Sequence, residues 1–150
     1  MSGVSNFNFA NPTRIVFGKG QIAQLPSLVP KGSIVYMTYG GGSIKRNGVY
    51  DQVKEALKDY EMYEFGGIEA NPDFDTLKKA VYEIRKLDMD RVFLLAVGGG
   101  SVCDGTKFIA GACKYTDSED LWDMIITHGA TCKDAVPMGV VLTLPAVSIE

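Results

Sequence analysis

One stretch of the chain decides the fold: residues 91–101 read RVFLLAVGGGS, an apolar run followed at once by Gly98-Gly99-Gly100-Ser101. A near-continuous apolar run, here Arg91–Val97, predicts a strand that is buried on both faces, as in a parallel sheet. Because glycine has no Cβ, three glycines at the carboxyl end of such a strand let the backbone approach a ligand closely. Open α/β folds bind ligands at this edge of the sheet. The stretch therefore predicts an α/β fold with a binding loop, and a simple tight turn is the less favoured alternative.

Strands and helices alternate along the rest of the chain. The spacing of apolar residues predicts helices at Gln21–Leu28, from about Gly48 to Tyr60, from Asn71-Pro72 to Leu87 and at Ser101–Cys113, and extended segments at Arg14–Phe17, Ser33–Thr38, Glu61–Phe65 and Met138–Thr143. Such alternation predicts βαβ units, and their right-handed crossovers place helices on both faces of a sheet. We therefore expect residues 1–150 to form one α/β domain, an open, mostly parallel Rossmann-like sheet with helices on both faces.

Composition and charge narrow the class of protein. The 150 residues include 15 Lys+Arg and 18 Asp+Glu, with a net charge of −3 and 46% hydrophobic residues. This balance is typical of a globular chain, and its mild acidity argues against a nucleic-acid partner. The polar opening Met1–Asn6 leads us to expect no secretory signal, and the longest apolar stretch, Val92–Val97, is far shorter than the roughly 18 residues of a membrane span. The odd count of three Cys fits a reducing, cytoplasmic location.

The loop Gly98–Ser101 suits an anion. Ser101 is expected to cap the helix that follows, whose unpaired N–H groups and dipole favour a bound diphosphate. Two familiar phosphate motifs are near misses: the Rossmann fingerprint needs glycine where Cys103 stands, and the P-loop needs Lys-Ser/Thr where the chain has Thr106-Lys107. Asp104, one turn into the helix, either complements the helix dipole or points toward the bound group, and the residues favour neither.

A second Gly-Gly-Gly-Ser loop, Gly40–Ser43, has a different character. In dinucleotide-binding sheets an acidic residue at the end of the second strand holds the ribose 2′-OH of NAD. The region Thr38–Arg46 has no acid and contains two cations, Lys45 and Arg46. Such a site accepts a 2′-phosphate, so the sequence favours NADP(H) over NAD(H). The alternative is that Lys45 and Arg46 are ordinary solvated surface charges.

Three strings carry a resemblance to a known family. They are PTRIVFGKG at Pro12–Gly20, EFGGIEANP at Glu64–Pro72 and LAVGGGSVCDGTK at Leu95–Lys107. Together they resemble the group III, iron-containing alcohol dehydrogenases, most closely the branch of NADPH-dependent aldehyde reductases and butanol dehydrogenases. The resemblance covers the N-terminal half of such enzymes and implies a dehydroquinate synthase-like N-terminal domain. It also implies an oxidoreductase that transfers hydride between a nicotinamide and a primary alcohol or aldehyde.

The resemblance also implies roles for individual residues, all of them toward NADP(H). It places Gly41, Gly42 and Ser43 at the adenosine end, with Ser43 near the 2′-phosphate. It places Asn71 beside the adenosine ribose, Gly99, Gly100, Ser101 and Val102 at the diphosphate, Asp104 by the nicotinamide end, and Thr143 and Leu144 against the adenine and ribose. No catalytic residue is expected in this chain.

A metal site is expected to be missing. Members of the resembled family carry a divalent metal, iron or zinc, on one Asp and three His of a second, helical domain. Here the single His is His128, and the three Cys match no zinc spacing. Where the family continues with Thr-Gly-Ser-Glu, this chain has Val147-Ser148-Ile149-Glu150, and Val147 lacks a hydroxyl. We therefore expect a truncated chain that lacks the metal-binding domain and does not act on alcohols or aldehydes alone.

Two other functions stay open at this point. One is a stand-alone, non-catalytic nucleotide-binding module. The other is the same fold in a related reaction, that of glycerol dehydrogenases or dehydroquinate synthases, which the strings at Phe17–Gly20 and Glu64–Gly67 disfavour. The apolar strand at Met138–Thr143 has no following helix to cover it, which predicts exposed apolar surface and hence dimerisation or aggregation.

Overall fold

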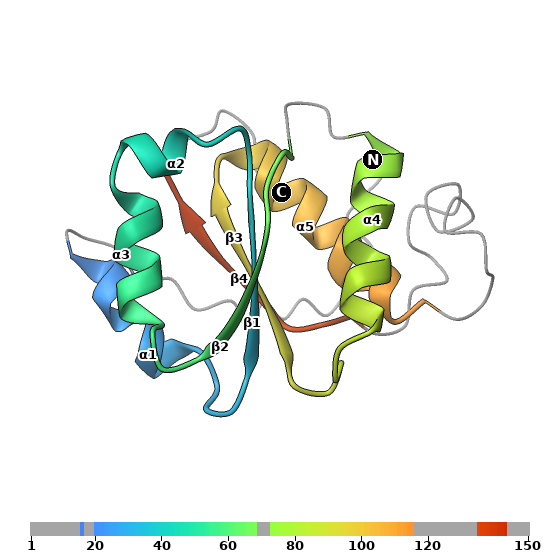
Figure 1. Cartoon of the computed structure of the whole chain (residues 1–150), viewed down its shortest axis with the longest axis horizontal. Helices are drawn as coiled ribbons and strands as arrows, with labels where there is room; N and C mark the ends of the chain where they lie inside the picture. The colour runs from blue at the N-terminus through green and yellow to red at the C-terminus, as the bar shows by residue number, and fades with distance from the viewer. Residues whose placement is uncertain (1–15, 17–19, 69–72, 116–134, 144–150) are drawn as a thin grey trace, which may run out of the picture.

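The computed structural model describes residues 16, 20–68, 73–115 and 135–143. Four parallel strands form one twisted sheet in the order β2-β1-β3-β4 (Figure 1). The strands are β1 (Ile34–Tyr39), β2 (Glu61–Phe65), β3 (Val92–Gly98) and β4 (Met138–Leu142). The chain leaves β1 toward β2 on one side and returns to β3 on the other, so the switch point of the topology lies between β1 and β3. This arrangement confirms the predicted α/β fold with an open parallel sheet.

Six helical segments surround this sheet in the part of the chain that the structure describes. They are η1 (Gln21–Gln24), α1 (Leu25–Leu28), α2 (Ser43–Arg46), α3 (Val49–Ala56), α4 (Phe74–Arg85) and α5 (Gly100–Cys113). Asp73 begins α4, because its carboxylate accepts a hydrogen bond from the backbone N–H of Asp75. Arg85 closes the far end of α5 by donating to the carbonyl groups of Ala112, Cys113 and Tyr115. Side-chain hydrogen bonds thus cap the start of α4 and join its C-terminal residue to the end of α5.

Helices cover both faces of the sheet, as predicted (Figure 1). Side chains alternate along β1, so Val35 and Met37 face one way and Ile34 and Tyr36 face the other. The first pair packs with the α1 and α3 side, and the second with α4 and α5. All but one side chain of β3 is buried, which confirms that its apolar run is a strand enclosed on both faces.

Some predicted elements differ from the structure or lie beyond it. The segment after β1 was expected to be a loop, but Ser43–Arg46 forms the single turn of α2, a piece too short to show helical periodicity. Helix α3 ends at Ala56, four residues before the predicted Tyr60. The predicted strand Arg14–Phe17 and the helix start at Asn71-Pro72 lie outside the described residues. On β4, Val140 and Leu142 are 41% and 47% exposed, in line with the predicted apolar surface.

Candidate functional site

The carboxyl ends of β1 and β3 bring the two Gly-Gly-Gly-Ser loops side by side. Tyr39, the last residue of β1, pairs with Val97, the last residue but one of β3. The loop after β2 joins them, because the N–H of Gly67 donates to the Gly40 carbonyl at 2.9 Å. The end of β4 joins from the other side, where the N–H of Thr143 donates to the Gly98 carbonyl at 3.0 Å. The predicted binding edge is therefore one continuous strip built by all four strands.

Val102 packs between the two loops. A Cβ at Gly98 would lie 2.9 Å from Val102 Cγ2, and a Cβ at Gly40 would lie 3.6 Å from the same atom and 3.1 Å from the Ile68 carbonyl oxygen. Other protein atoms therefore fill the space that a side chain at Gly40 or Gly98 would need, which favours glycine at both positions. The side chain of Val102, only 5% exposed, is a packing group, so only its backbone is left to meet a bound diphosphate.

Gly41 and Gly99 are different. A Cβ at either position would meet no described atom within 4 Å, and neither has the positive φ that favours glycine. Gly42, by contrast, has φ +107° and turns the chain into α2, which a residue with a Cβ adopts only with strain. Neither a close contact with a described atom nor a positive φ requires glycine at Gly41 or Gly99. Open space over these two positions is what a ligand that approaches the backbone would need.

Two buried hydroxyl groups, those of Thr38 in β1 and Thr106 in α5, form a hydrogen bond between the elements that flank the two loops. The Oγ1 atoms of Thr38 and Thr106 lie 2.6 Å apart, and neither side chain is exposed to solvent. Thr106 also donates to the Val102 carbonyl at 2.7 Å. Since its hydroxyl has one hydrogen, Thr38 must be the donor between the two threonines. The strand before the first loop is thereby hydrogen-bonded to the helix after the second.

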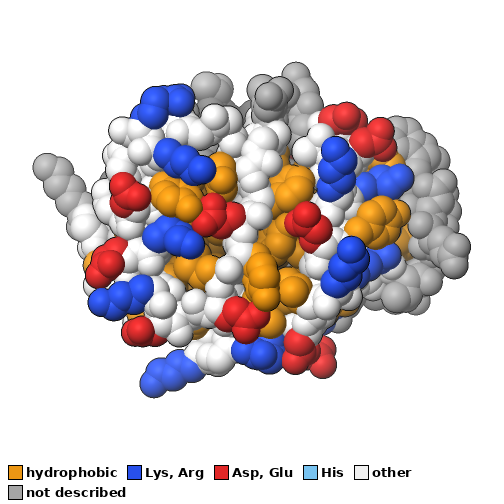
Figure 2. All heavy atoms as spheres, viewed as in Figure 1, with side chains coloured by type: hydrophobic (Ala, Val, Ile, Leu, Met, Phe, Trp, Pro, Cys, Tyr) orange, Lys and Arg blue, Asp and Glu red, His pale blue; other side chains and the backbone are white. Residues whose placement is uncertain are grey.

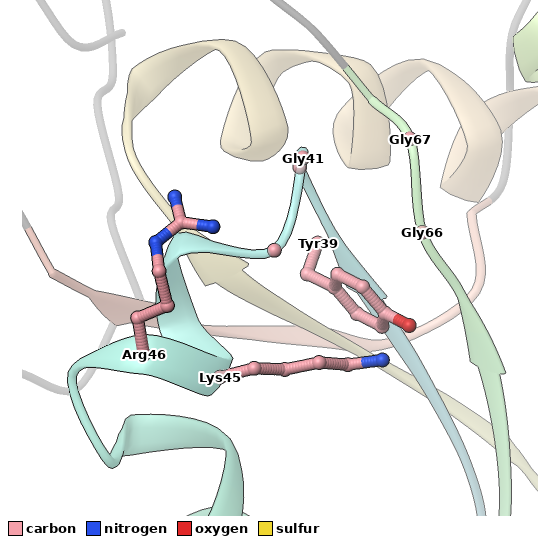
Figure 3. Close-up of a pocket in the computed structure, with 8 residues that line it drawn as sticks. Tyr39, Gly41, Lys45, Arg46, Gly66 and Gly67 are labelled. Atoms are coloured by element: carbon pink, nitrogen blue, oxygen red, sulfur yellow. The ribbon is translucent and has the colours of Figure 1, made fainter.

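A shallow pocket of about 490 Å³ opens at the first loop (Figure 3). Its lining consists of small residues on one side and of aromatic and basic side chains on the other: Tyr39, Gly40, Gly41, Gly42, Lys45, Arg46, Gly66 and Gly67. The Tyr39 ring lies against Gly66, where a Cβ would come within 2.5 Å of a ring carbon. The pocket has the polarity and size to take part of a phosphorylated ligand.

Aromatic and charged side chains gather around Tyr39 and Lys45, two of the residues that line this pocket. The Lys45 ammonium lies 5.2 Å from the centre of the Tyr39 ring and 5.0 Å from that of Tyr50. Glu64 Oε2 accepts hydrogen bonds from the Tyr50 hydroxyl at 2.7 Å and from Lys54 Nζ at 3.1 Å. In the space-filling view, basic, hydrophobic and acidic side chains lie next to one another over α2 and α3 (Figure 2). We refer to Tyr39, Lys45, Tyr50, Lys54 and Glu64 as the Tyr–Lys–Glu cluster.

Hydrogen bonds within this cluster move two pKa values. Burial alone would raise the pKa of Glu64, but the hydrogen bonds from Tyr50 and Lys54 and the charges of Lys54 and Lys45 hold it below its ordinary value. The hydrogen bond to the Glu64 carboxylate raises the pKa of Tyr50 to about 12. The carboxylate is therefore ionised and already engaged by protein donors. Oε1 of this carboxylate has a further, long contact from the Tyr39 hydroxyl at 3.5 Å.

The predicted site residues differ in their exposure and in whether they line the pocket. Gly41 and Gly42 line the pocket, whereas Ser43 is exposed as the first residue of α2 and is not among the lining residues. Gly99 and Gly100 begin α5, and Thr143 lies beside Gly98. Asp104 is exposed in the second turn of α5. Asn71 and Leu144 lie outside the described residues.

One predicted contact is wrong. Ser101 was expected to cap α5, but the helix begins at Gly100 with Gly99 as its N-cap, and no side chain caps it. Ser101 is therefore the second residue within the helix. The glycine triplet is flexible enough to start the helix two residues earlier than a serine cap would, and the backbone N–H groups at its start need no side-chain partner when they face a ligand or solvent.

Sequence reasoning missed Tyr39, Gly66 and Gly67 as pocket residues. The string Glu64–Gly67 contributed to the family resemblance. Its two glycines directly after a predicted strand also indicate the carboxyl edge of the sheet, where the two Gly-Gly-Gly-Ser loops lie. The packing of Tyr39 on Gly66 could not be found from spacing, because it joins positions 27 residues apart whose contact depends on the register of β1 with β2.

The thiols are packing groups. Cys103 and Cys113 are buried, and burial raises the pKa of both, that of Cys113 to about 12. His128 and Cys132 lie outside the described residues. Within the described ranges, no group of three or more His, Cys, Asp or Glu side chains could hold a metal ion. Over the same ranges, no helix has both the length and the apolar character needed to span a membrane.

A parallel sheet with two glycine loops at its switch point places the chain in the class of Rossmann-like α/β proteins, with a candidate site at the carboxyl edge of the sheet. A model of the family described as iron-containing alcohol dehydrogenase matches residues 12–150. The chain belongs to this family.

Individual relatives agree with this assignment. The NADPH-dependent aldehyde reductase YqhD of Escherichia coli (strain K12) is 54% identical over 147 residues, which cover 98% of this chain and 38% of the relative. The probable NADH-dependent butanol dehydrogenase 2 of Bacillus subtilis (strain 168) is 48% identical, covering 98% and 37%. The crystal structure of E. coli K-12 YqhD superposes with a TM-score of 0.89 at 55% identity, covering 96% of this chain and 36% of that one. The chain thus spans well under half the length of these relatives.

Proposed function

We propose that this chain is the NADP(H)-binding domain of a metal-dependent alcohol dehydrogenase or aldehyde reductase. The observation that carries the proposal is the pair Gly41 and Gly99. Both stand at neighbouring strand ends, where a Cβ would meet no atom of the described residues within 4 Å and no positive φ calls for glycine. A dinucleotide that lies across the switch point would use that space, with its adenosine end at the first loop and its diphosphate at the second. Membership of the family supports the same reading.

The residues present fit such a cofactor. Gly41, Gly42 and the pocket around them would hold the adenosine and its 2′-phosphate, and the basic side chains of α2 supply positive charge there. Gly99, Gly100 and the backbone N–H groups at the start of α5 would hold the diphosphate. Thr143, next to Gly98, would meet the same end of the cofactor from β4, and Asp104 would lie toward the nicotinamide. Ser43, Ser101, Val102, Asn71 and Leu144 complete the predicted contact set. When bound, a nicotinamide supplies or accepts hydride.

The metal of such enzymes does not fit this chain. Three histidine ligands are implied by the resemblance, and the whole sequence contains one His. Small alcohols and aldehydes are the proposed substrates of the longer enzyme, and we propose that the 150 residues alone bind cofactor without turning over. A cytoplasmic location and a homodimer stay predictions of the sequence.

Calorimetric titration of the purified chain tests the proposal. We expect saturable 1:1 binding of NADPH that is tighter than that of NADH, and no butyraldehyde-dependent oxidation of NADPH. Gly41→Val, which places a side chain in open space of the pocket, should weaken NADPH binding without lowering the melting temperature. Absence of binding by either nucleotide would refute the proposal. Nucleotide binding without preference would favour a general nucleotide-binding module, and turnover would contradict the account of the metal.

A further inference from the structure

Two cations line the first-loop pocket, and the structure gives them different surroundings. Lys45 and Arg46 are neighbours in α2, and both are exposed side chains that line the pocket with Gly41 and Gly42. The sequence offers no way to rank them. Their contacts in the structure distinguish them, and this difference bears on the preference between NADP(H) and NAD(H).

The Lys45 ammonium is already engaged by the protein. It lies about equally close to the Tyr39 and Tyr50 rings, at 5.2 and 5.0 Å from their centres, in the range of favourable cation–π contact. The two rings meet edge to face, with centres 6.1 Å apart. Its charge also acts on the Glu64 carboxylate, which Tyr50 and Lys54 hold by hydrogen bonds. Lys45, although exposed, thus lies over two aromatic rings and near an anion that offsets its charge.

Arg46 lacks such partners. Within the described residues its guanidinium makes no hydrogen bond, ion pair or ring contact. Figure 3 shows Lys45 running along beneath the Tyr39 ring, while the Arg46 side chain extends in another direction, with its guanidinium rising toward the level of the glycine loop. A guanidinium presents N–H donors in a planar fork that matches two oxygens of a phosphate, and it is not titrated at any ordinary pH.

We propose that Arg46 is the specificity-determining residue of the site, the group that binds the 2′-phosphate of NADP(H), and that Lys45 is a positioning residue that holds the Tyr39 and Tyr50 rings. This inference rests on the proposed function and adds to it the side chain on which the cofactor preference depends. The two relatives described above differ in the nicotinamide nucleotide named for them, so such a preference varies within the family.

The competing explanation is general electrostatics. Any cation near the carboxyl edge would attract the additional charge of NADP(H), and in that case no single side chain would dominate. A matched control separates the two explanations. Lys86 is exposed at the C-terminal end of α4, at the opposite edge of the sheet, so Lys86→Ala removes the same charge without touching the pocket.

Titrations of the full 150-residue chain with NADPH and NADH, at low and at moderate salt, test the proposal. For Arg46→Ala we expect NADPH to bind about tenfold or more weakly, with the NADH affinity within about twofold of the wild type, because only the contact to the 2′-phosphate is lost. Arg46→Lys should recover part of the NADPH affinity, since it keeps the charge but not the fork. The additional salt dependence of NADPH over NADH should disappear in Arg46→Ala and persist in Lys86→Ala.

Lys45→Ala supplies the contrasting readout. This substitution should lower the melting temperature and reduce the affinities for NADPH and NADH by similar factors, so that the ratio of the two affinities stays near the wild-type value. The proposal is overturned if Arg46→Ala leaves the NADPH-to-NADH ratio unchanged, or if Lys45→Ala or Lys86→Ala changes it as much. If the wild type binds neither nucleotide, the proposed function itself fails. If it binds both and only the ratio is insensitive to Arg46, this inference alone fails.

Discussion

The two Gly-Gly-Gly-Ser loops have the same four residues in the same place at the end of a parallel strand, yet they build different surfaces. The first leads into the four-residue helix α2, and charged and aromatic side chains surround it. The second leads directly into the fourteen-residue helix α5, whose next residues, Val102 and Cys103, are buried. The first loop can therefore discriminate between ligands through side chains, whereas the second offers mainly backbone.

Within each loop, one glycine packs against protein and its neighbour faces open space. Gly40 and Gly98 are crowded by Ile68 and Val102, whereas no atom in the part of the chain that the structure describes would crowd a Cβ at Gly41 or Gly99. The repeated motif thus combines a glycine that the fold requires with one that a ligand would require. Substitution of each glycine separates these two requirements.

The largest effect is expected in the second loop. In Gly98→Ala, the new Cβ would lie 2.9 Å from Val102 Cγ2 at a φ of +154°, so overpacking and backbone strain add. We expect the free energy of unfolding to fall by about 2–3 kcal/mol. For a chain of this size the melting temperature should fall by roughly 5–10 °C. Thermal unfolding followed by circular dichroism measures the change.

Gly99→Ala is the matched control, since its Cβ meets no described atom within 4 Å and its φ is −92°. Its melting temperature should be close to that of the wild type, but it should bind NADPH more weakly. If Gly99→Ala is destabilised as much as Gly98→Ala, then both glycines serve the fold, and the argument that open space marks a ligand site is wrong.

A smaller effect is expected where the two loops are joined. Thr106→Val removes the acceptor of the Thr38 hydroxyl and the donor to the Val102 carbonyl, so it should cost about 1–2 kcal/mol in the free energy of unfolding. Thr38→Val removes the 2.6 Å hydrogen bond to Thr106 and a long contact to the Leu95 carbonyl at 3.5 Å, but leaves Thr106 bonded to Val102, so about 1 kcal/mol is expected. Urea unfolding of both single variants and the double variant measures these costs.

The double variant tests whether the hydroxyls act as a unit. Because neither buried group is then left without its partner, its cost should be less than the sum of the single costs. Additive costs would mean that Thr38 and Thr106 stabilise the two loops independently, in conflict with the 2.6 Å contact between their hydroxyls.

Much of this comparison could be predicted from the sequence, because periodicity reports burial and glycine runs report strand ends. The run Arg91–Val97 and the alternation along the chain led to the correct sheet and to both loops. The surroundings of the loops could not be predicted, because they depend on register and on helix length. Ser101 follows the glycines as a cap would, yet α5 begins before it. Lys45 and Arg46 are equivalent in the sequence, and only the placement of Tyr39 and Tyr50 separates them.

The smallest effect is expected in the Tyr–Lys–Glu cluster, which belongs to the first loop alone. Glu64 has a folded-state pKa below its ordinary value of 4.5, so its ionisation stabilises the fold above pH 4.5. That stability is lost as the pH falls through the lower, folded-state pKa. Glu64→Gln should therefore be less stable than the wild type by about 0.5–1 kcal/mol near neutral pH, an amount reduced by the solvent exposure of the cluster.

Urea unfolding between pH 3 and pH 8 measures the difference, which should be constant from about pH 6 upward and shrink toward pH 3 as Glu64 takes up a proton in the wild type. Glu55→Gln is the matched control, because Glu55 pairs with Lys58 at 3.3 Å on the exposed side of α3, where an ion pair adds little. It should show no comparable difference at any pH. If the stability of the two variants depends on pH in the same way, Glu64 is an ordinary surface charge and the Tyr–Lys–Glu cluster does not depend on its ionisation. If only Glu64→Gln changes, the side chains under the first loop form a charge-dependent unit that the second loop lacks.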